Sequence, residues 1–145
     1  MINALSGVDS AAMAMTAERI RMDVVSQNIA NAHTTRGVDG NGPYRRQQVV
    51  FETVLQESRQ GANGGVSPMG VRVARIDQDP RAPRQVYNPA HPDANPTTGL
   101  VAMPNVEMHT EMVDMITSSR AFEANLMVVK TAKTLAMQTL GIGKR

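Results

Sequence analysis

The residues best suited to chemistry in this chain are its three histidines and the acidic groups near them. His109-Thr-Glu111 matches a fragment of a zinc-deaminase signature, in which the histidine binds metal and the glutamate transfers protons. That signature also needs a Cys-x-x-Cys pair, and the chain contains no cysteine. His33 and His91 lie in unrelated segments, and no His-Glu-x-x-His or Gly-x-Ser-x-Gly spacing organises a metal or a nucleophile. The sequence therefore predicts no enzyme, no metal site and no cofactor, with His109 and Glu111 as a surface pair on the first turns of a helix.

Composition argues against a nucleic-acid binder and against a large independent core. The net charge is only +2, and the arginines are spread through the middle of the chain without interleaved aromatic residues. Two Phe, two Tyr and no Trp leave few of the large side chains that dominate cores, whereas eleven Met suit long, adaptable contacts between helices. The lack of cysteine is compatible with an extracytoplasmic location and leaves the redox compartment open.

The N-terminal region lacks the marks of a secretory signal peptide. Its first eighteen residues contain no Lys or Arg, and the small-residue run from Ala11 to Ala17 is too short and too weakly apolar for a signal core. No stretch approaches the roughly 18 to 20 apolar residues that span a bilayer. We expect a protein that does not span a membrane and that, if exported, leaves the cytoplasm by another route without a cleaved signal peptide.

The elements that position these residues are two long helical segments at the ends of the chain. The first carries an apolar seam with a seven-residue repeat, formed by Val8, Met15, Met22 and Ile29 with Ala4, Ala11, Val25 and Ala32 interleaved. Only Glu18 interrupts it. The second seam alternates steps of four and three residues through Met108, Met112, Met115, Ser119, Phe122, Leu126, Val129, Lys133, Ala136 and Leu140. Such seams require partners, and an intramolecular helix hairpin and an intermolecular assembly both supply them.

Capping signals bound the two helices. The first is expected to begin at a cap on Asn3 or Ser6 and to end by Ala32. The second is expected to be capped by Asn105, with Gly141 as its terminator.

The middle of the chain is expected to form short strands and a connector. Residues 44–55 and 71–76 are predicted strands and residues 84–87 a possible third, which together make a small hairpin or a three-stranded sheet. Residues 61–65 are expected to form a flexible tip. Five of the eight prolines fall between residues 79 and 99, which predicts an extended connector without regular structure.

The end of the first helical segment carries the most specific motif. In Val25-Ser-Gln-Asn-Ile-Ala-Asn-Ala32, the side-chain amides of Asn28 and Asn31 can bond backbone groups where the helix unwinds. The string resembles the N-terminal signature of flagellar axial proteins, the rod and hook family, and the rest of the chain is similar to proximal rod subunits. The similarity covers nearly the whole chain, through residues 43–51, 70–73, 86–92, 103–106, 111–116, 119–125 and 133–140.

This resemblance implies an α+β protein in which long N- and C-terminal helices (residues 1–35 and 105–145) pair as a coiled-coil core domain lining a helical tube. Residues 36–104 would form a small β and extended outer segment that contacts neighbouring subunits. It further implies a structural subunit of the bacterial flagellar basal-body proximal rod, which transmits torque. Its expected partners are further copies of itself, other rod proteins, proteins at the junction of rod and membrane ring, the flagellar type III export apparatus and the rod cap, in the periplasmic part of the basal body.

The predicted assembly interface consists of the two seams and the signature asparagines: Val8, Met15, Met22, Val25, Asn28, Ile29, Asn31, Met112, Met115, Phe122, Leu126, Val129 and Leu140. Five apolar residues lie off these seams and are expected to contact adjacent subunits: Ile20, Val24, Val113, Ile116 and Val128. A soluble coiled-coil adaptor or export chaperone that binds a partner helix is the alternative function.

Overall fold

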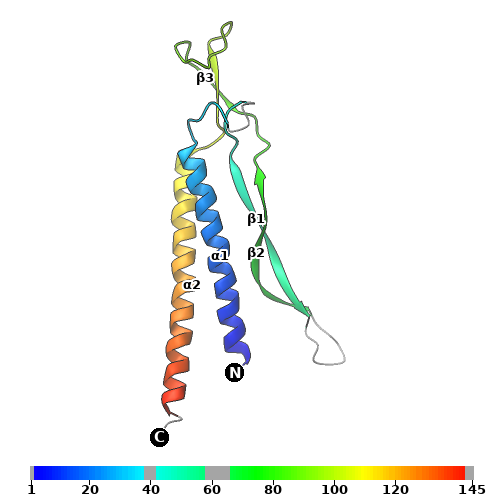
Figure 1. Ribbon diagram of the computed structural model, residues 1–145, viewed down its shortest axis with the longest axis vertical. Coiled ribbons are helices and arrows are strands. Elements are labelled where there is room, and N and C mark those ends of the chain that lie inside the picture. The colour runs from blue at the N-terminus through cyan, green and yellow to red at the C-terminus, as the bar shows by residue number, and fades with distance from the viewer. Residues whose placement is uncertain (1, 38–41, 58–65, 143–145) are drawn as a thin grey trace. The chain divides into compact units, whose positions relative to one another are not determined.

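The computed structural model describes residues 2–37, 42–57 and 66–142, which form an α+β arrangement of two long helices and four strands (Figure 1). In chain order these are α1 (Ile2–Ala30), β1 (Gln47–Glu57), β2 (Val66–Gln78), β3 (Arg84–Tyr87), β4 (Leu100–Met103) and α2 (Met108–Ile142). The α+β class and the two long terminal helices are therefore confirmed. The tip expected at residues 61–65 lies outside the described residues.

The helix ends differ from the predicted caps. Because α1 already begins at Ile2, Asn3 and Ser6 lie inside the helix, and their prediction as caps is wrong. α2 begins at Met108, and Asn105 does not cap it, because its Oδ1 accepts the backbone N–H of Arg46 at 3.1 Å. Gly141 does not terminate α2, which continues to Ile142. The end of α1 at Ala30 agrees with the predicted end by Ala32. Side-chain patterns thus located both helices and this end, but not the other helix ends.

Among the described residues, the strands form two separate two-stranded sheets, β1 with β2 and β3 with β4. The expected three-stranded sheet is wrong, because β3 pairs antiparallel with β4, with Arg84 opposite Met103 and Tyr87 opposite Leu100. The expectation of a connector without regular structure is also wrong. It contains β3, and the loop after it is closed by backbone hydrogen bonds from Asn88 to Gly99 and from Gly99 to Asn95.

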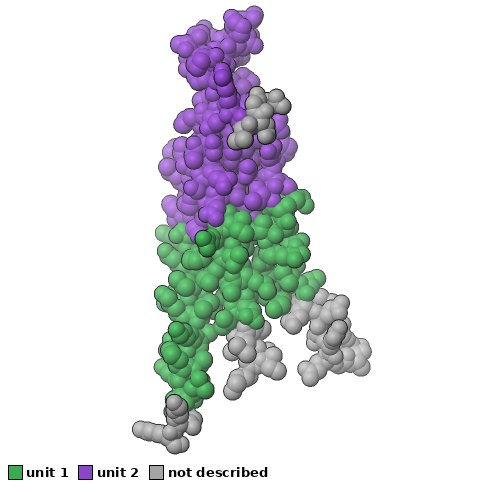
Figure 2. Space-filling view, viewed as in Figure 1, with its two compact units in different colours: residues 1–20, 50–75, 117–145 green, residues 21–49, 76–116 purple. Residues whose placement is uncertain are grey.

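The residues divide into two compact units, shown in different colours in Figure 2. Unit 1 comprises residues 1–20, 50–75 and 117–145, and unit 2 comprises residues 21–49 and 76–116. Each unit thus combines parts of both helices with part of the middle segment. The division of the chain at residues 35 and 104 stays a prediction.

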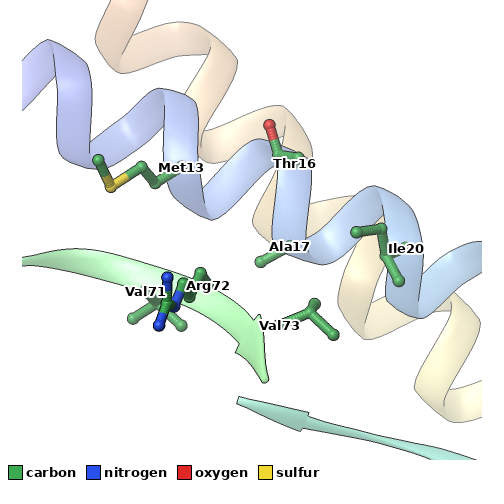
Figure 3. Close-up of a pocket in the computed structure, with 7 residues that line it drawn as sticks. All are labelled: Met13, Thr16, Ala17, Ile20, Val71, Arg72 and Val73. Carbon is green, nitrogen blue, oxygen red and sulfur yellow. The ribbon is translucent and has the colours of Figure 1, made fainter. Parts of the chain in front are cut away.

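In unit 1, α1 lies against β2. A cavity of about 280 Å³ lies between them. Its lining residues, drawn in Figure 3, are Met13, Thr16, Ala17 and Ile20 of α1 and Val71, Arg72 and Val73 of β2. The two elements approach so closely that a Cβ at Gly70 would lie 2.7 Å from the sulfur of Met13. Ile20, expected to contact an adjacent subunit, therefore already has neighbours within its own chain.

Alanine, valine and polar residues, rather than methionines, occupy the most buried positions of the helices. On α1, the buried apolar residues are Ala11, Ala17, Val24 and Val25. Val24, expected to contact an adjacent subunit, is therefore already covered within its own chain. On α2, Glu111 and Ser118 are fully buried, one position before the predicted seam residues Met112 and Ser119. Small side chains allow close approach of neighbouring backbones, while the longer methionines stand beside the line of contact.

Candidate functional site

The signature asparagine Asn28 is the centre of a buried polar cluster in unit 2. Its side chain is fully buried near the C-terminal end of α1. Its Nδ2 donates to the backbone carbonyl of Gln47 at 2.8 Å and to Oε2 of Glu111 at 2.9 Å. Its Oδ1 accepts the backbone N–H of Gln47 at 2.9 Å and the hydroxyl of Tyr44 at 2.8 Å. The amide therefore uses both donors and both acceptor positions.

A buried ion pair completes the cluster. Glu111, in the first turn of α2, is fully buried, and its Oε1 accepts Nε of Arg46 at 2.6 Å. Only 16 % of the Arg46 side chain is exposed. Because an unpaired carboxylate at this depth would be strongly disfavoured, Arg46 and Asn28 together stabilise the charge on Glu111.

Further contacts connect the same segments. Asp114 of α2 lies 3.6 Å from Arg46 and 3.4 Å from Arg21 of α1. The backbone of Arg46 is held on both sides, since its N–H donates to Asn105 and its carbonyl accepts the N–H of Asp79. The chain before β1 is thereby fixed between the end of α1 and the start of α2.

The polar cluster changes the pKa of the Tyr44 hydroxyl. Burial raises the pKa of its hydroxyl, and the nearby negative charge of Glu111 raises that pKa further. Tyr44 therefore stays protonated and keeps donating its hydrogen bond to Asn28. The cluster holds no nucleophile activated by a base, and its polar atoms bond to one another. Its chemistry is that of a structural junction.

A second polar group surrounds Asp93, also in unit 2. Its carboxylate accepts the hydroxyl of Thr35 at 2.7 Å and Nε of Arg36 at 2.6 Å, and these two bonds lower its pKa. The backbone N–H of Asp93 donates to Nδ1 of His91. The loop between β3 and β4 is thus bound to the segment that directly follows the signature motif.

The surface pair expected at His109 and Glu111 is only half correct. His109 is exposed, but Glu111 is fully buried and bonded to Asn28 and Arg46. The described ranges contain no group of three or more His, Asp or Glu side chains placed to hold a metal ion. No helix in the described part of the chain is both long enough and apolar enough to cross a membrane.

The predicted interface residues fall into three classes of exposure. Val25 and Asn28 are buried. Met112 and Leu140 are exposed, to 49 % and 73 %. The remaining nine are partly exposed: Val8, Met15, Met22, Ile29, Asn31, Met115, Phe122, Leu126 and Val129. Asn31 donates to the carbonyl of Gln27 within its own chain, which confirms that it bonds a backbone group where the helix ends.

Sequence reasoning missed Tyr44, Arg46 and Glu111 as members of the cluster. The sequence favours a surface position for Glu111, because acidic residues are common in the first turn of exposed helices. The available signal was the position of all three inside motifs that resemble the rod and hook family.

Comparisons with known proteins agree with this resemblance over the full chain. Residues 9–36 match the family described as flagella basal body rod protein, and residues 97–142 match the family described as flagellar basal body rod FlgEFG protein C-terminal. The flagellar basal-body rod protein FlgC of Bacillus subtilis is 40 % identical over 99 % of this chain and 100 % of its own length. The FlgC proteins of Borreliella burgdorferi and Salmonella typhimurium are 40 % and 38 % identical, each over 94 % of this chain and 95 % of their own length.

Proposed function

Because the chain belongs to the FlgC family of flagellar basal-body rod proteins, we propose that it is a structural subunit of the proximal rod that transmits torque. The observation that carries this function is the identity of about 40 % along almost the whole length of both chains. A match of this extent includes both terminal helices and the middle segment, so it concerns the complete fold.

Assembly proceeds through the terminal helices, which pair as a coiled-coil core domain. Two features support this proposal. Contacts of Asn28 with Glu111 and of Arg21 with Asp114 join the last turns of α1 to the first turns of α2 in unit 2. Large apolar side chains are exposed along α2, and a rod lattice would cover them: Met112, Ile116, Met127, Val128, Leu135, Met137 and Leu140.

The polar cluster has a separate role in this proposal. It fixes the start of β1 and the start of α2 against the signature motif of α1, and so determines how the middle segment leaves the helices. Buried polar groups that bond only in one arrangement favour that arrangement over others. Every subunit of the rod would then present its middle segment in the same way.

The partners follow from a place in the proximal rod. They are further copies of this chain, other rod proteins, the proteins at the junction of rod and membrane ring, and the rod cap. The subunit reaches the periplasmic rod through the flagellar type III export apparatus, with its N-terminus uncleaved.

Membership of a structural rod family agrees with the prediction that the chain is not an enzyme. The alternative of a soluble adaptor or export chaperone is not favoured. The FlgC proteins that match this chain along almost its whole length are rod proteins. No separate feature of the described residues supports a chaperone.

Complementation tests the function directly. The full chain, carrying a C-terminal tag, is expressed in a flagellated bacterium whose own FlgC gene is deleted. We expect the cells to swim again. We also expect the tagged protein outside the cytoplasm or in basal bodies, with an N-terminal peptide whose mass matches the uncleaved sequence. A chain that stays cytoplasmic and leaves the cells without flagella would contradict the proposal.

A further inference from the structure

The sides of α1 and α2 that bond each other in unit 2 can be traced through two contacts. Asn28 of α1 donates to Glu111 of α2, and Arg21 of α1 donates to Asp114 of α2. Residue numbers fall along α1 from 28 to 21 while they rise along α2 from 111 to 114, so the two helices run antiparallel. The bonded residues are seven apart on α1 and three apart on α2, and both spacings keep them on one side of their helix.

The same two sides carry Glu18 and Ser118 about one turn further on. Glu18 lies three residues before Arg21 on α1, and Ser118 lies four residues after Asp114 on α2. Spacings of three and four residues keep both side chains on the bonded sides of their helices. At ~1.5 Å per residue the steps are about 4.5 Å and about 6 Å, in the same direction because the helices are antiparallel. Glu18 and Ser118 both belong to unit 1 and are therefore expected to face each other there.

Each of the two side chains has a buried polar atom without a hydrogen-bond partner. Within residues 2–37, 42–57 and 66–142, neither Oε2 of Glu18 nor Oγ of Ser118 is bonded. Ser118 is fully buried, and Glu18 is only partly exposed. Buried polar atoms in folded proteins almost always have a partner, because leaving one unbonded is unfavourable. Two such atoms on facing sides of a helix pair indicate a shared partner.

The chemistry of the two atoms fits a water molecule. A carboxylate oxygen only accepts hydrogen bonds, whereas a hydroxyl both donates and accepts. The two atoms do not bond each other directly in the structure. One water can donate to Oε2 of Glu18 and at the same time bond Oγ of Ser118, and buried waters in proteins bind between polar groups of this kind.

We propose that Glu18 and Ser118 bind one water molecule between α1 and α2, and that this bridge is a further cross-helix contact that holds the two helices together in unit 1. The inference rests on the proposed pairing of the terminal helices, which is part of the proposed function. It gives a reason for a carboxylate at the point where Glu18 interrupts the apolar repeat of α1. The small side chain of Ser118 leaves room for the water, which a larger side chain would fill.

A double-mutant cycle on the purified full chain provides the first test. Glu18→Met keeps the length of the side chain and removes the carboxylate, and Ser118→Ala removes the hydroxyl. In urea denaturation followed by helix circular dichroism, Ser118→Ala should raise the unfolding equilibrium constant by about three- to tenfold in the natural chain. In the Glu18→Met background the same change should alter it by less than about twofold. An equal effect of Ser118→Ala in both backgrounds would overturn the inference.

The neighbouring serine supplies the matched control for the cycle. Ser119 is partly exposed and lies one position away from the bonded side of α2. Ser119→Ala should therefore have the same effect on the unfolding equilibrium with and without Glu18→Met. A coupling to Glu18 as large as that of Ser118 would mean that the cycle does not report the assigned contact, and would also overturn it.

A crystal structure of the full chain that shows ordered waters tests the site directly. We expect a water about 2.5–3.0 Å from both Oε2 of Glu18 and Oγ of Ser118. The same water should be lost in the Ser118→Ala variant. A direct bond between the two side chains, or a dry gap between them, would overturn the inference. Failure of the natural chain to complement the deletion strain would instead contradict the proposed function and leave both of these readouts unchanged.

Discussion

Replacement of Asn28 by Ala is the sharpest test of the buried cluster. It removes four hydrogen bonds at a fully buried position and leaves the N–H and carbonyl of Gln47 without the amide that binds them. The buried Oε2 of Glu111 loses its donor at a cost of about 1–3 kcal/mol, and each of the two part-buried backbone groups of Gln47 loses a bond worth about 0.5–1.5 kcal/mol, so the change costs about 2–6 kcal/mol. Since whole domains are stable by only about 5–15 kcal/mol, this change would remove a large part of the stability of unit 2.

The other signature asparagine supplies a matched control. Asn31 is partly exposed, and its amide donates only to the carbonyl of Gln27 and accepts the hydroxyl of Thr34. Water can replace these bonds, so Asn31→Ala should cost about 0.5–1.5 kcal/mol. Two asparagines three residues apart in the same motif are thus expected to differ severalfold in their effect.

Urea denaturation followed by tyrosine fluorescence measures the difference. The chain has no Trp, and of its two tyrosines Tyr44 bonds Asn28 whereas Tyr87 is 72 % exposed. The change in emission on unfolding should therefore come mainly from the cluster. Equal midpoints for the Asn28→Ala and Asn31→Ala variants would refute the reasoning, because the cluster would then contribute nothing beyond an ordinary polar helix end.

Three further predictions concern the seams, pH and the middle segment. Rod assembly should stop, while export continues, in each of three seam variants: Met22→Asp, Ile29→Asp and Leu126→Asp. Each substitution buries an unpaired carboxylate in the rod at about 3–5 kcal/mol per subunit. Motile cells would show that the predicted seam is wrong. The Asp93 pKa is lowered by Thr35 and Arg36, so its stabilisation is complete above an unfolded-state pKa of about 3.9 and disappears as pH falls through the lower folded-state value. Thermal melts should therefore show a steeper acid loss for the natural chain than for Asp93→Asn. Exchange of residues 40–103 for the middle of a related rod protein should give an exported chain that does not complement, and normal swimming would place specificity in the helices instead.

The sequence predicted the elements with strong periodicity or clear turn residues. Both helices, β1, β2 and β3 have predicted counterparts, since each combines a matching side-chain pattern with enough length or clear bounding prolines and glycines. β4 was missed, because Leu100–Met103 has only four residues and is a strand through its pairing with β3. Pairing between distant segments is not encoded in a local pattern.

The same limit explains the buried cluster. Asn28 and Glu111 are 83 residues apart, and neither residue type indicates burial by itself. On α2, the fully buried residues Glu111 and Ser118 each lie one position before a predicted seam residue, and this difference has another cause. An apolar pattern identifies the side of a helix that is covered, whereas the fully buried residues of α2 are Glu111 and Ser118, and neither is apolar. The ranking of burial within that side depends on the neighbouring element, which the helix sequence does not contain.

Electron microscopy of purified basal bodies, with a C-terminal label on this chain, tests most directly whether the chain is a subunit of the proximal rod. We predict label on the rod next to the membrane-embedded ring, and its absence from basal bodies of a strain that lacks the gene. Label found only in the cytoplasm, with intact rods that do not contain the chain, would contradict the claim.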